Sequence, residues 1–114
     1  MKLISEIKPS AMLNCGILEA MNKIMNALSS DKQVENLSED NANQEIRGTW
    51  NLKINKFLGA GSGTGILIRY SFVELEEGNT MVTATCSREN GKQDFFEIGG
   101  MYEKIMRRPF EALK

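Results

Sequence analysis

The sequence predicts an α+β fold in which an antiparallel sheet of about five strands packs against an N-terminal and a C-terminal helix. Between Thr64 and Ile98, apolar and polar residues alternate and are rich in β-branched and aromatic types, the pattern of strands with one buried face. Two glycine-containing turns divide this stretch into strands over residues 65–75, 80–88 and 92–98. Apolar residues at helical spacing nearer the two ends of the chain predict the helices.

The two turns determine the register of this meander. Glu76-Glu77-Gly78 and Glu89-Asn90-Gly91 both end in glycine, which favours three-residue loops with a left-handed glycine at a G1 bulge. Two-residue turns would instead leave Phe72 opposite a threonine. We therefore expect the core-facing side chains to be the even-numbered ones, Ile66, Ile68, Tyr70, Phe72, Val82, Ala84, Cys86, Phe96 and Ile98.

The first half of the chain predicts a strand, a helix and a loop. Residues 2–8 form a short strand that Pro9 ends, because proline cannot donate to a ladder. Ser10 is a suitable N-cap for a helix over residues 10–28, within which Gly16 is a weak point. Residues 29–45 are polar and predict a surface loop, with one helical turn near its middle as the alternative.

The second half adds the remaining elements. Residues 46–57 alternate again and predict a half-buried strand that contains Trp50. The glycine-rich segment Gly59–Gly65 lacks the lysine of a phosphate-binding loop and precedes a strand, so we expect a hairpin or a bulged edge. Residues 100–113 predict a helix that kinks or ends near Arg108, because Pro109 follows.

Length and composition limit the function. A chain of 114 residues predicts a single domain over residues 1–114, and a net charge of -1 argues against nucleic-acid binding. No apolar run has the length of a membrane span or the form of a signal peptide, which predicts a cytoplasmic protein. The absence of histidine excludes Ser-His and Cys-His catalysis, and two cysteines do not make a zinc site. We expect no enzymatic activity, no metal and no cofactor.

Three segments together have the order typical of a known superfamily. They are Leu3 to Ser10 leading into a helix, the hairpin from Tyr70 to Thr83, and the terminal segment from Tyr102 to Arg108. The chain resembles the helix-grip proteins, which include START domains, Bet v 1-like proteins and polyketide cyclases. The resemblance implies a curved sheet with a terminal helix lying across it and an apolar cavity between them for a hydrophobic ligand. The chain departs from that pattern in its fewer strands and its shorter terminal helix.

The leading functional hypothesis is therefore the binding of a small hydrophobic molecule between the sheet and the C-terminal helix. Candidate wall residues combine apolar area with hydroxyl or indole donors; they are Trp50, Tyr70, Phe72, Phe96, Met101, Tyr102 and Ile105. The same residues would suit a filled core.

Two other hypotheses stay open. The alternative is a protein-interaction module or homodimer without a small-molecule ligand, since Leu18 and Met25 widen the apolar stripe of the first helix beyond what one partner requires. An enzymatic role would have to use surface carboxylates as general acid or base, and no spacing marks any of the candidates Glu74, Glu76, Asp94 and Glu97.

Overall fold

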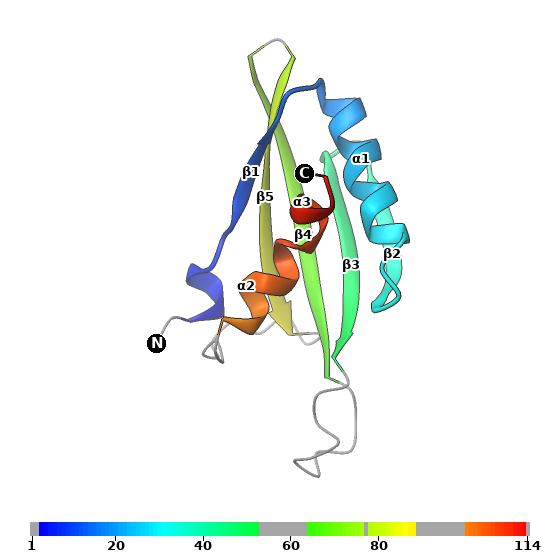
Figure 1. Cartoon of the computed structure of the whole chain (residues 1–114), viewed down its shortest axis with the longest axis vertical. Helices are drawn as coiled ribbons and strands as arrows, with labels where there is room; N and C mark the ends of the chain where they lie inside the picture. The colour runs from blue at the N-terminus through cyan, green and yellow to red at the C-terminus, as the bar shows by residue number, and fades with distance from the viewer. Residues whose placement is uncertain (1–2, 53–63, 77, 89–99, 114) are drawn as a thin grey trace.

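The computed structural model describes residues 3–52, 64–76, 78–88 and 100–113. The predicted α+β class is confirmed, because these residues form a five-stranded antiparallel sheet in the order β1-β5-β4-β3-β2 together with helices (Figure 1). In chain order the elements are the 3₁₀-helix η1 (Ile4–Glu6), β1 (Ser10–Leu13), α1 (Ile17–Ser29), β2 (Val34–Asp40), β3 (Glu45–Leu52), β4 (Thr64–Glu76), β5 (Asn79–Arg88), α2 (Met101–Met106) and α3 (Arg108–Ala112).

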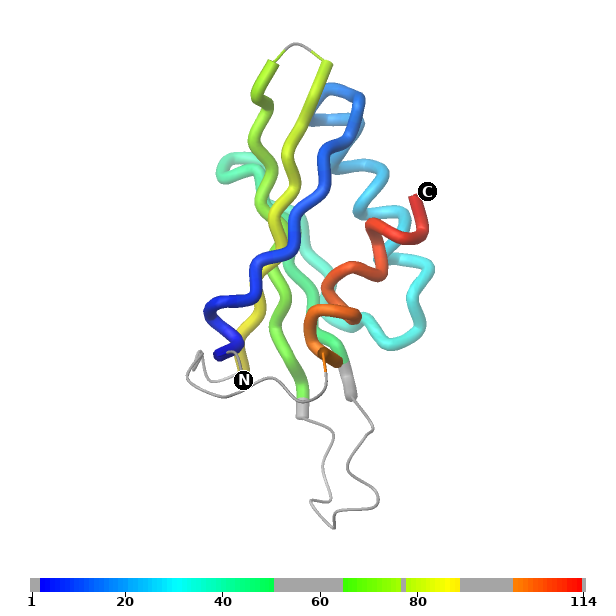
Figure 2. Tube along the Cα trace, turned by 60° about the vertical axis from the view of Figure 1, so that its left-hand side comes forward, coloured from blue at the N-terminus to red at the C-terminus, as the bar shows by residue number. Residues whose placement is uncertain are grey.

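The helices α1, α2 and α3 lie on one face of the sheet, which we call the inner face (Figure 2). The hydrophobic core lies between this face and the helices. On β4 and β5 the even-numbered residues point inward and are buried, as predicted; they are Ile66, Ile68, Tyr70, Phe72, Val82, Ala84 and Cys86. The odd-numbered residues of these strands point to the opposite, outer face, which no described helix covers (Figure 2).

The register predicted for the hairpin between β4 and β5 is confirmed, and Glu77 of its turn lies outside the described residues. Gly78 has a φ of 85°, in the left-handed region that favours glycine. The pairing shifts between Glu74 and Glu76, which marks the bulge. This bulge keeps Phe72 opposite Val82 on the inner face. The predicted second turn and the strand over residues 92–98 lie outside the described residues.

The prediction of a strand over residues 2–8 is wrong. Ile4 and Ile7 are both buried, and a spacing of three residues suits the turn of η1 rather than the two-residue repeat of a strand. The strand follows Pro9 instead of ending at it. The Pro9 carbonyl accepts a hydrogen bond from the Ala84 N–H at 2.9 Å, and Ser10 then pairs with Thr83.

The prediction that the first helix begins at Ser10 is also wrong, because α1 begins at Ile17. Gly16 is its N-cap residue and lies outside the helix, with no side chain to act as a cap. The missing acceptor comes from β4, since the Ile17 N–H donates to Glu74 Oε1 at 3.0 Å. The inner stripe of α1 is as expected, with Ala20, Met21, Ile24 and Leu28 buried.

The prediction of a loop over residues 29–45 is wrong as well, since β2 pairs with β3 within this stretch. Its register shifts between Glu35 and Ser38, so that one extra residue is inserted, and Asn36 has a φ of 53°. The bulge lets Val34 and Leu37 share one side of the strand although they are three residues apart. Such a strand does not show the two-residue alternation that would identify it.

The C-terminal segment breaks where it was predicted to break. Arg107 separates α2 from α3, and Pro109 lies in the first turn of α3, where its missing N–H costs nothing. The predicted strand over residues 46–57 is present as β3, which ends at Leu52; residues 53–63, including most of the glycine-rich segment, lie outside the described residues. Within the described ranges, none of the helices combines the length and the hydrophobicity that a membrane crossing requires.

Candidate functional site

The predicted cavity wall is part of the packed core. Trp50 and Tyr70 are fully buried, and Phe72 and Ile105 are buried as well. Met101 and Tyr102 are half-buried and pack against the core from α2, whereas Phe96 lies outside the described residues. The described candidates on the sheet and on α2 therefore lie together, as members of one packed core or as residues packed against it.

An aromatic cluster fills the space between the sheet and α3. The ring of Tyr70 lies 6.3 Å from that of Trp50 and 5.9 Å from that of Phe110, the latter edge to face. The Tyr70 hydroxyl donates to the Met106 carbonyl at 2.9 Å, which ties the end of α2 to β4. Phe110 was not among the predicted residues, because its position one residue after Pro109 gives no periodic signal.

One polar atom in this cluster has no partner among the described residues. The indole Nε1 of Trp50 is buried and makes no hydrogen bond with any of them. An indole N–H normally finds an acceptor when it is buried. Trp50 is also crowded from β3 itself, because a Cβ added at Gly48 would lie 3.2 Å from Trp50 Cζ3 and 3.2 Å from Val34 Cγ1. Because Gly48 has no side chain, it leaves space for the Trp50 indole to pack.

The buried titratable groups are held in their neutral forms. Burial raises the pKa of the Tyr70 hydroxyl and that of the Cys15 thiol. A thiol with a raised pKa is a poor nucleophile. Both cysteines are buried, and neither forms a disulfide.

Of the four carboxylates considered for catalysis, Asp94 and Glu97 lie outside the described residues, and Glu74 is engaged as the cap of α1. Glu76 lies beside the hairpin turn and is exposed. In the described part of the chain, no group of three or more acidic or cysteine side chains could hold a metal ion.

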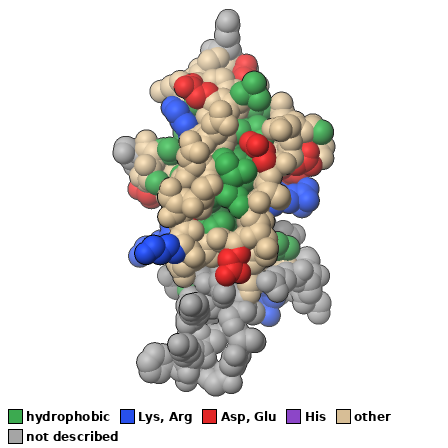
Figure 3. All heavy atoms as spheres, turned by 90° about the vertical axis from the view of Figure 1, so that its right-hand side faces the viewer, with side chains coloured by type: hydrophobic (Ala, Val, Ile, Leu, Met, Phe, Trp, Pro, Cys, Tyr) green, Lys and Arg blue, Asp and Glu red, His purple; other side chains and the backbone are tan. Residues whose placement is uncertain are grey.

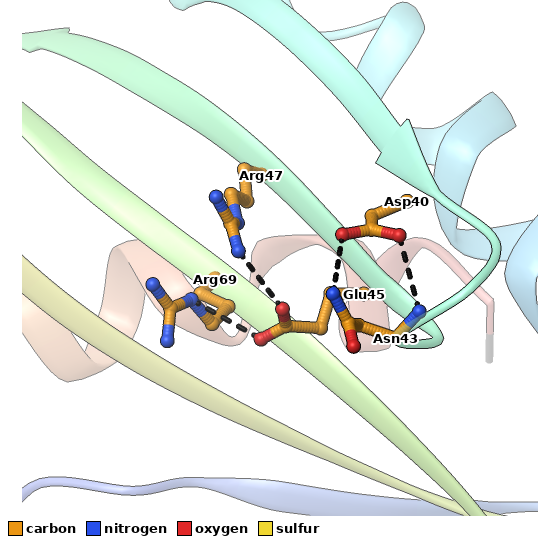
Figure 4. Close-up of polar contacts among 5 residues, drawn as sticks. All are labelled: Asp40, Asn43, Glu45, Arg47 and Arg69. Atoms are coloured by element: carbon orange, nitrogen blue, oxygen red, sulfur yellow. Dashed lines mark hydrogen bonds and ion pairs between the residues drawn. The ribbon is translucent and has the colours of Figure 1, made fainter.

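The outer face carries a charged cluster that the sequence analysis did not identify. Arg47 on β3 and Arg69 on β4 lie directly opposite each other. Glu45 lies between them, with Oε1 3.0 Å from Arg47 Nη2 and Oε2 3.2 Å from Arg69 Nε (Figure 4). The correct register of β3 against β4 would have placed Arg47 opposite Arg69. The sequence did not give this register, because the predicted strand began at residue 46 and so left out Glu45.

The same view shows how the neighbouring turn is held. Both oxygens of Asp40 accept hydrogen bonds from Asn43, one from its backbone N–H at 3.1 Å and one from its side-chain Nδ2 at 2.8 Å (Figure 4). These bonds hold the pKa of the Asp40 carboxyl below its usual value. They fix the connection that positions Glu45 at the start of β3.

Two hollows are lined by described residues. One, of about 440 Å³, lies beside the charged cluster on the outer face and is lined by Arg47, Leu67, Ile68, Arg69, Thr85, Cys86 and Ser87. The other, of about 790 Å³, is a shallower groove between the end of α1 and α3. Arg108 crosses that groove, with Nε 3.3 Å from Asp31 Oδ2 and Nη1 2.6 Å from Gln33 Oε1. Neither hollow lies between the sheet and α2, where the ligand was predicted.

A group of apolar side chains is exposed on the outer face near the hairpin. Met12 on β1 lies opposite Met81 on β5, and Met81 lies opposite Val73 on β4, so that the three form a row across three strands. Leu75 follows two residues beyond Val73. Met12, Val73 and Leu75 expose 44%, 54% and 55% of their surfaces. We call these four residues the hairpin surface.

The exposed side of α1 is partly apolar too. Seen from the side of α1 and β2, hydrophobic side chains form a band down the middle of the surface between charged ones (Figure 3). Leu18 exposes 72% of its surface, so the predicted widening of the helix stripe is present at this residue. Met25, in contrast, packs against the core.

Comparison with protein-family models and with curated proteins gives no match. Among solved structures, the chain is similar to the adenylate sensor from AMP-activated protein kinase, solved in complex with 5-aminoimidazole-4-carboxamide 1-β-D-ribofuranotide. The TM-score is 0.63 at 16% identity, and the match covers 90% of this chain and 93% of that chain. The protein TTHA0849 from Thermus thermophilus matches at a TM-score of 0.34 and 13% identity, over 93% of this chain and 86% of that one. At these identities the first likeness shows a shared fold, and the second is too weak for any argument.

Proposed function

We propose that this chain is a non-enzymatic binding domain that works through the outer face of its sheet, and that the hairpin surface on this face binds a second copy of the chain. The observation that carries the proposal is the contrast between the two faces. The inner face is packed against helices, whereas the outer face leaves a row of large apolar side chains in solvent. Exposed apolar groups that lie together are typical of interaction sites.

A second copy is the partner that this row fits best. The row of Met12, Met81 and Val73 contains no charge, so it is complementary to itself under a twofold axis and needs no oppositely charged surface. Two sheets can pack face to face through such rows. Because four side chains cover much less than the roughly 800 Å² per partner of a stable complex, we expect a weak and reversible dimer.

Sedimentation velocity tests this proposal directly. The weight-average sedimentation coefficient should rise with protein concentration between roughly 10 μM and 1 mM, the range in which a weak dimer forms. Val73→Lys should abolish the rise, because it places a charge at the centre of the contact. Leu18→Lys is the matched control, since it makes the same change at an exposed apolar residue on α1. A wild-type chain that stays monomeric throughout would overturn the proposed self-association.

A second candidate follows from the unpaired Trp50 Nε1, which is a hydrogen-bond donor beside the C-terminal helices. In a domain of helix-grip type, this donor would orient a hydrophobic ligand that enters by displacing α2. The adenylate sensor, whose fold is similar to that of this chain, was solved with a small molecule bound, and this supports a ligand role. The packed aromatic cluster counts against it, so we place this candidate second.

Intrinsic fluorescence separates the two candidates, because Trp50 is the only tryptophan in the chain. A ligand between the sheet and α2 would contact the indole or its neighbours. Titration with palmitate, which does not absorb tryptophan emission, should leave the Trp50 emission unchanged if the outer face is the working surface. A saturable change in that emission would favour the inner site. A cytoplasmic location belongs to the same proposal, and two buried cysteines that form no disulfide are consistent with it.

A further inference from the structure

The positive charges of the Arg47 and Arg69 guanidinium groups are only partly neutralised by the carboxylate between them. They project from directly opposite positions on β3 and β4, an arrangement of like charges that is unfavourable unless it is compensated. Glu45 contacts one nitrogen of each arginine, at 3.0 and 3.2 Å. One carboxylate thus serves two cations, and the arginine side chains remain 48% and 52% exposed. Each guanidinium has five N–H donors, so both retain donors for a further acceptor.

The hollow of about 440 Å³ lies where such an acceptor would approach. Glu45 is paired with Ser71, two residues along the strands toward the hairpin from the arginine pair. Leu67 and Ser87 pair with each other, with Leu67 two residues from Arg69 in the opposite direction, and both line the hollow. An anion in the hollow therefore contacts the guanidinium groups on the side away from Glu45. Of the carboxylates on β2, Asp40 lies opposite Glu45 and thus on the far side too, whereas Glu35 lies opposite Thr49, in the row that contains Leu67 and Ser87.

We infer that this hollow binds the phosphate group of a small organic phosphate. Arginine recognises phosphate through several N–H donors at once, and a phosphate monoester offers three acceptor oxygens with close to two negative charges. The hydroxyls of Thr85 and Ser87 line the β5 side of the hollow and add donors there. Leu67, which exposes 37% of its surface, supplies an apolar contact for the organic part. The volume is in the range of small-molecule sites.

This inference deepens the proposed function, since it rests on the outer face as the working surface and names a ligand class for a second part of that face. The proposed dimer and the proposed phosphate site can be disproved independently of each other. Dimer formation depends on the hairpin surface and is read by sedimentation, whereas phosphate binding depends on the arginines and is read by ligand titration at a protein concentration where the chain is monomeric.

The experiment titrates the ¹⁵N-labelled protein with phenyl phosphate and follows the amide signals of Leu67, Arg69 and Ser87. Saturable shifts at these residues are expected. Inorganic phosphate should bind more weakly because it lacks the apolar part, and benzoate should bind more weakly because it has one oxygen and one charge fewer. Equal binding of benzoate would show a general anion site and overturn the assignment to phosphate. The absence of saturable shifts up to solubility would overturn the site itself.

Variants identify the groups that bind. Arg69→Gln should weaken phenyl phosphate binding by roughly tenfold or more, because a charge-assisted hydrogen bond is lost. Arg107→Gln is the matched control, since Arg107 is 43% exposed and pairs with Glu103 far from the hollow. If Arg69→Gln does not fold, Thr85→Val tests the opposite wall and should weaken binding several-fold. Unchanged affinity in a folded variant of either kind would overturn the inference.

Discussion

Trp50 and the residues around it determine how the core is packed. The indole is fully buried although its Nε1 has no hydrogen-bond partner among the residues that the structure describes. The burial of a large aromatic surface therefore outweighs the cost of one unpaired donor. The sequence correctly placed Trp50 on the inner side of its strand, because the alternation from Ile46 onward is regular. It could not show whether the surrounding space was open or filled, since the same residue types line cavities and cores.

Two substitutions at Trp50 distinguish the stability that comes from its buried apolar surface from the cost of its unpaired N–H donor. Trp50→Ala should lower the free energy of unfolding by about 3 to 5 kcal/mol, because it removes the indole and leaves a cavity. Trp50→Phe should cost less, since it keeps a ring and removes the unpaired N–H. Urea denaturation followed by circular dichroism measures both. A near-neutral Trp50→Ala would mean that the indole is not part of the packed core.

The carboxyl of Asp40 gives a pH dependence. The side-chain and backbone hydrogen bonds from Asn43 hold its pKa below the usual 3.8. Because the folded-state pKa is the lower one, these bonds stabilise the fold above pH 3.8, and this contribution is lost as the pH falls through the folded-state pKa. Asn43→Ala should move the pKa of Asp40 up toward 3.8 in an NMR titration, whereas Asn41→Ala should leave it in place. Equal titration curves for the two variants would contradict the role of Asn43.

At the scale of elements, the errors of the sequence analysis have identifiable causes. The strand β2 was missed because its bulge at Asn36 replaces two-residue alternation by a spacing of three. The start of α1 was misplaced because its cap is supplied by Glu74, which is 57 residues away in the sequence. Both features depend on contacts between distant segments. The register of the β4–β5 hairpin was predicted correctly, because Gly78 and the alternation of apolar and polar residues along the two strands determine it.

The cap of α1 can be tested at its first turn. Glu74→Ala should destabilise the protein by about 0.5 to 1 kcal/mol, in the range of other helix caps, because the Ile17 N–H loses its acceptor. Amide hydrogen exchange at Ile17 and Leu18 should become faster, while exchange in the middle of α1 changes little. Glu76→Ala is the control in the same hairpin. Equal effects of the two variants would show that the hydrogen bond of Glu74 does not stabilise the helix.

The packing of β2 on β3 depends on Gly48. A Cβ at this position already lies within 3.2 Å of Val34 and Trp50 side-chain atoms, so a larger side chain must displace one of them. Gly48→Val should lower the free energy of unfolding by about 1 to 3 kcal/mol through overpacking. Urea denaturation measures the loss, and the tryptophan emission should report the displaced indole. A stabilised Gly48→Val variant would contradict the close packing.

At the scale of the whole molecule, the described residues form a sheet with one face covered by helices and one face that no described helix covers (Figure 2). The α+β class and the core-facing residues of β4 and β5 followed from local patterns, whereas the site did not. The described wall residues belong to the packed core or pack against it, and the charged cluster on the outer face depends on the register of β3 against β4. The proposed binding surface is therefore the outer face, where Met12 and Val73 of the apolar row near the hairpin are exposed.

The most direct test of this central claim is a dilution series of ¹⁵N–¹H correlation spectra. If the hairpin surface binds a second copy, the amide signals of Met12, Val73 and Met81 should shift with protein concentration, while those of Ala20 and Ile24 on the buried stripe of α1 stay in place. Val73→Lys should remove the concentration dependence. Spectra that do not change with concentration, or changes confined to the helical side, would contradict the claim that the outer face is the working surface.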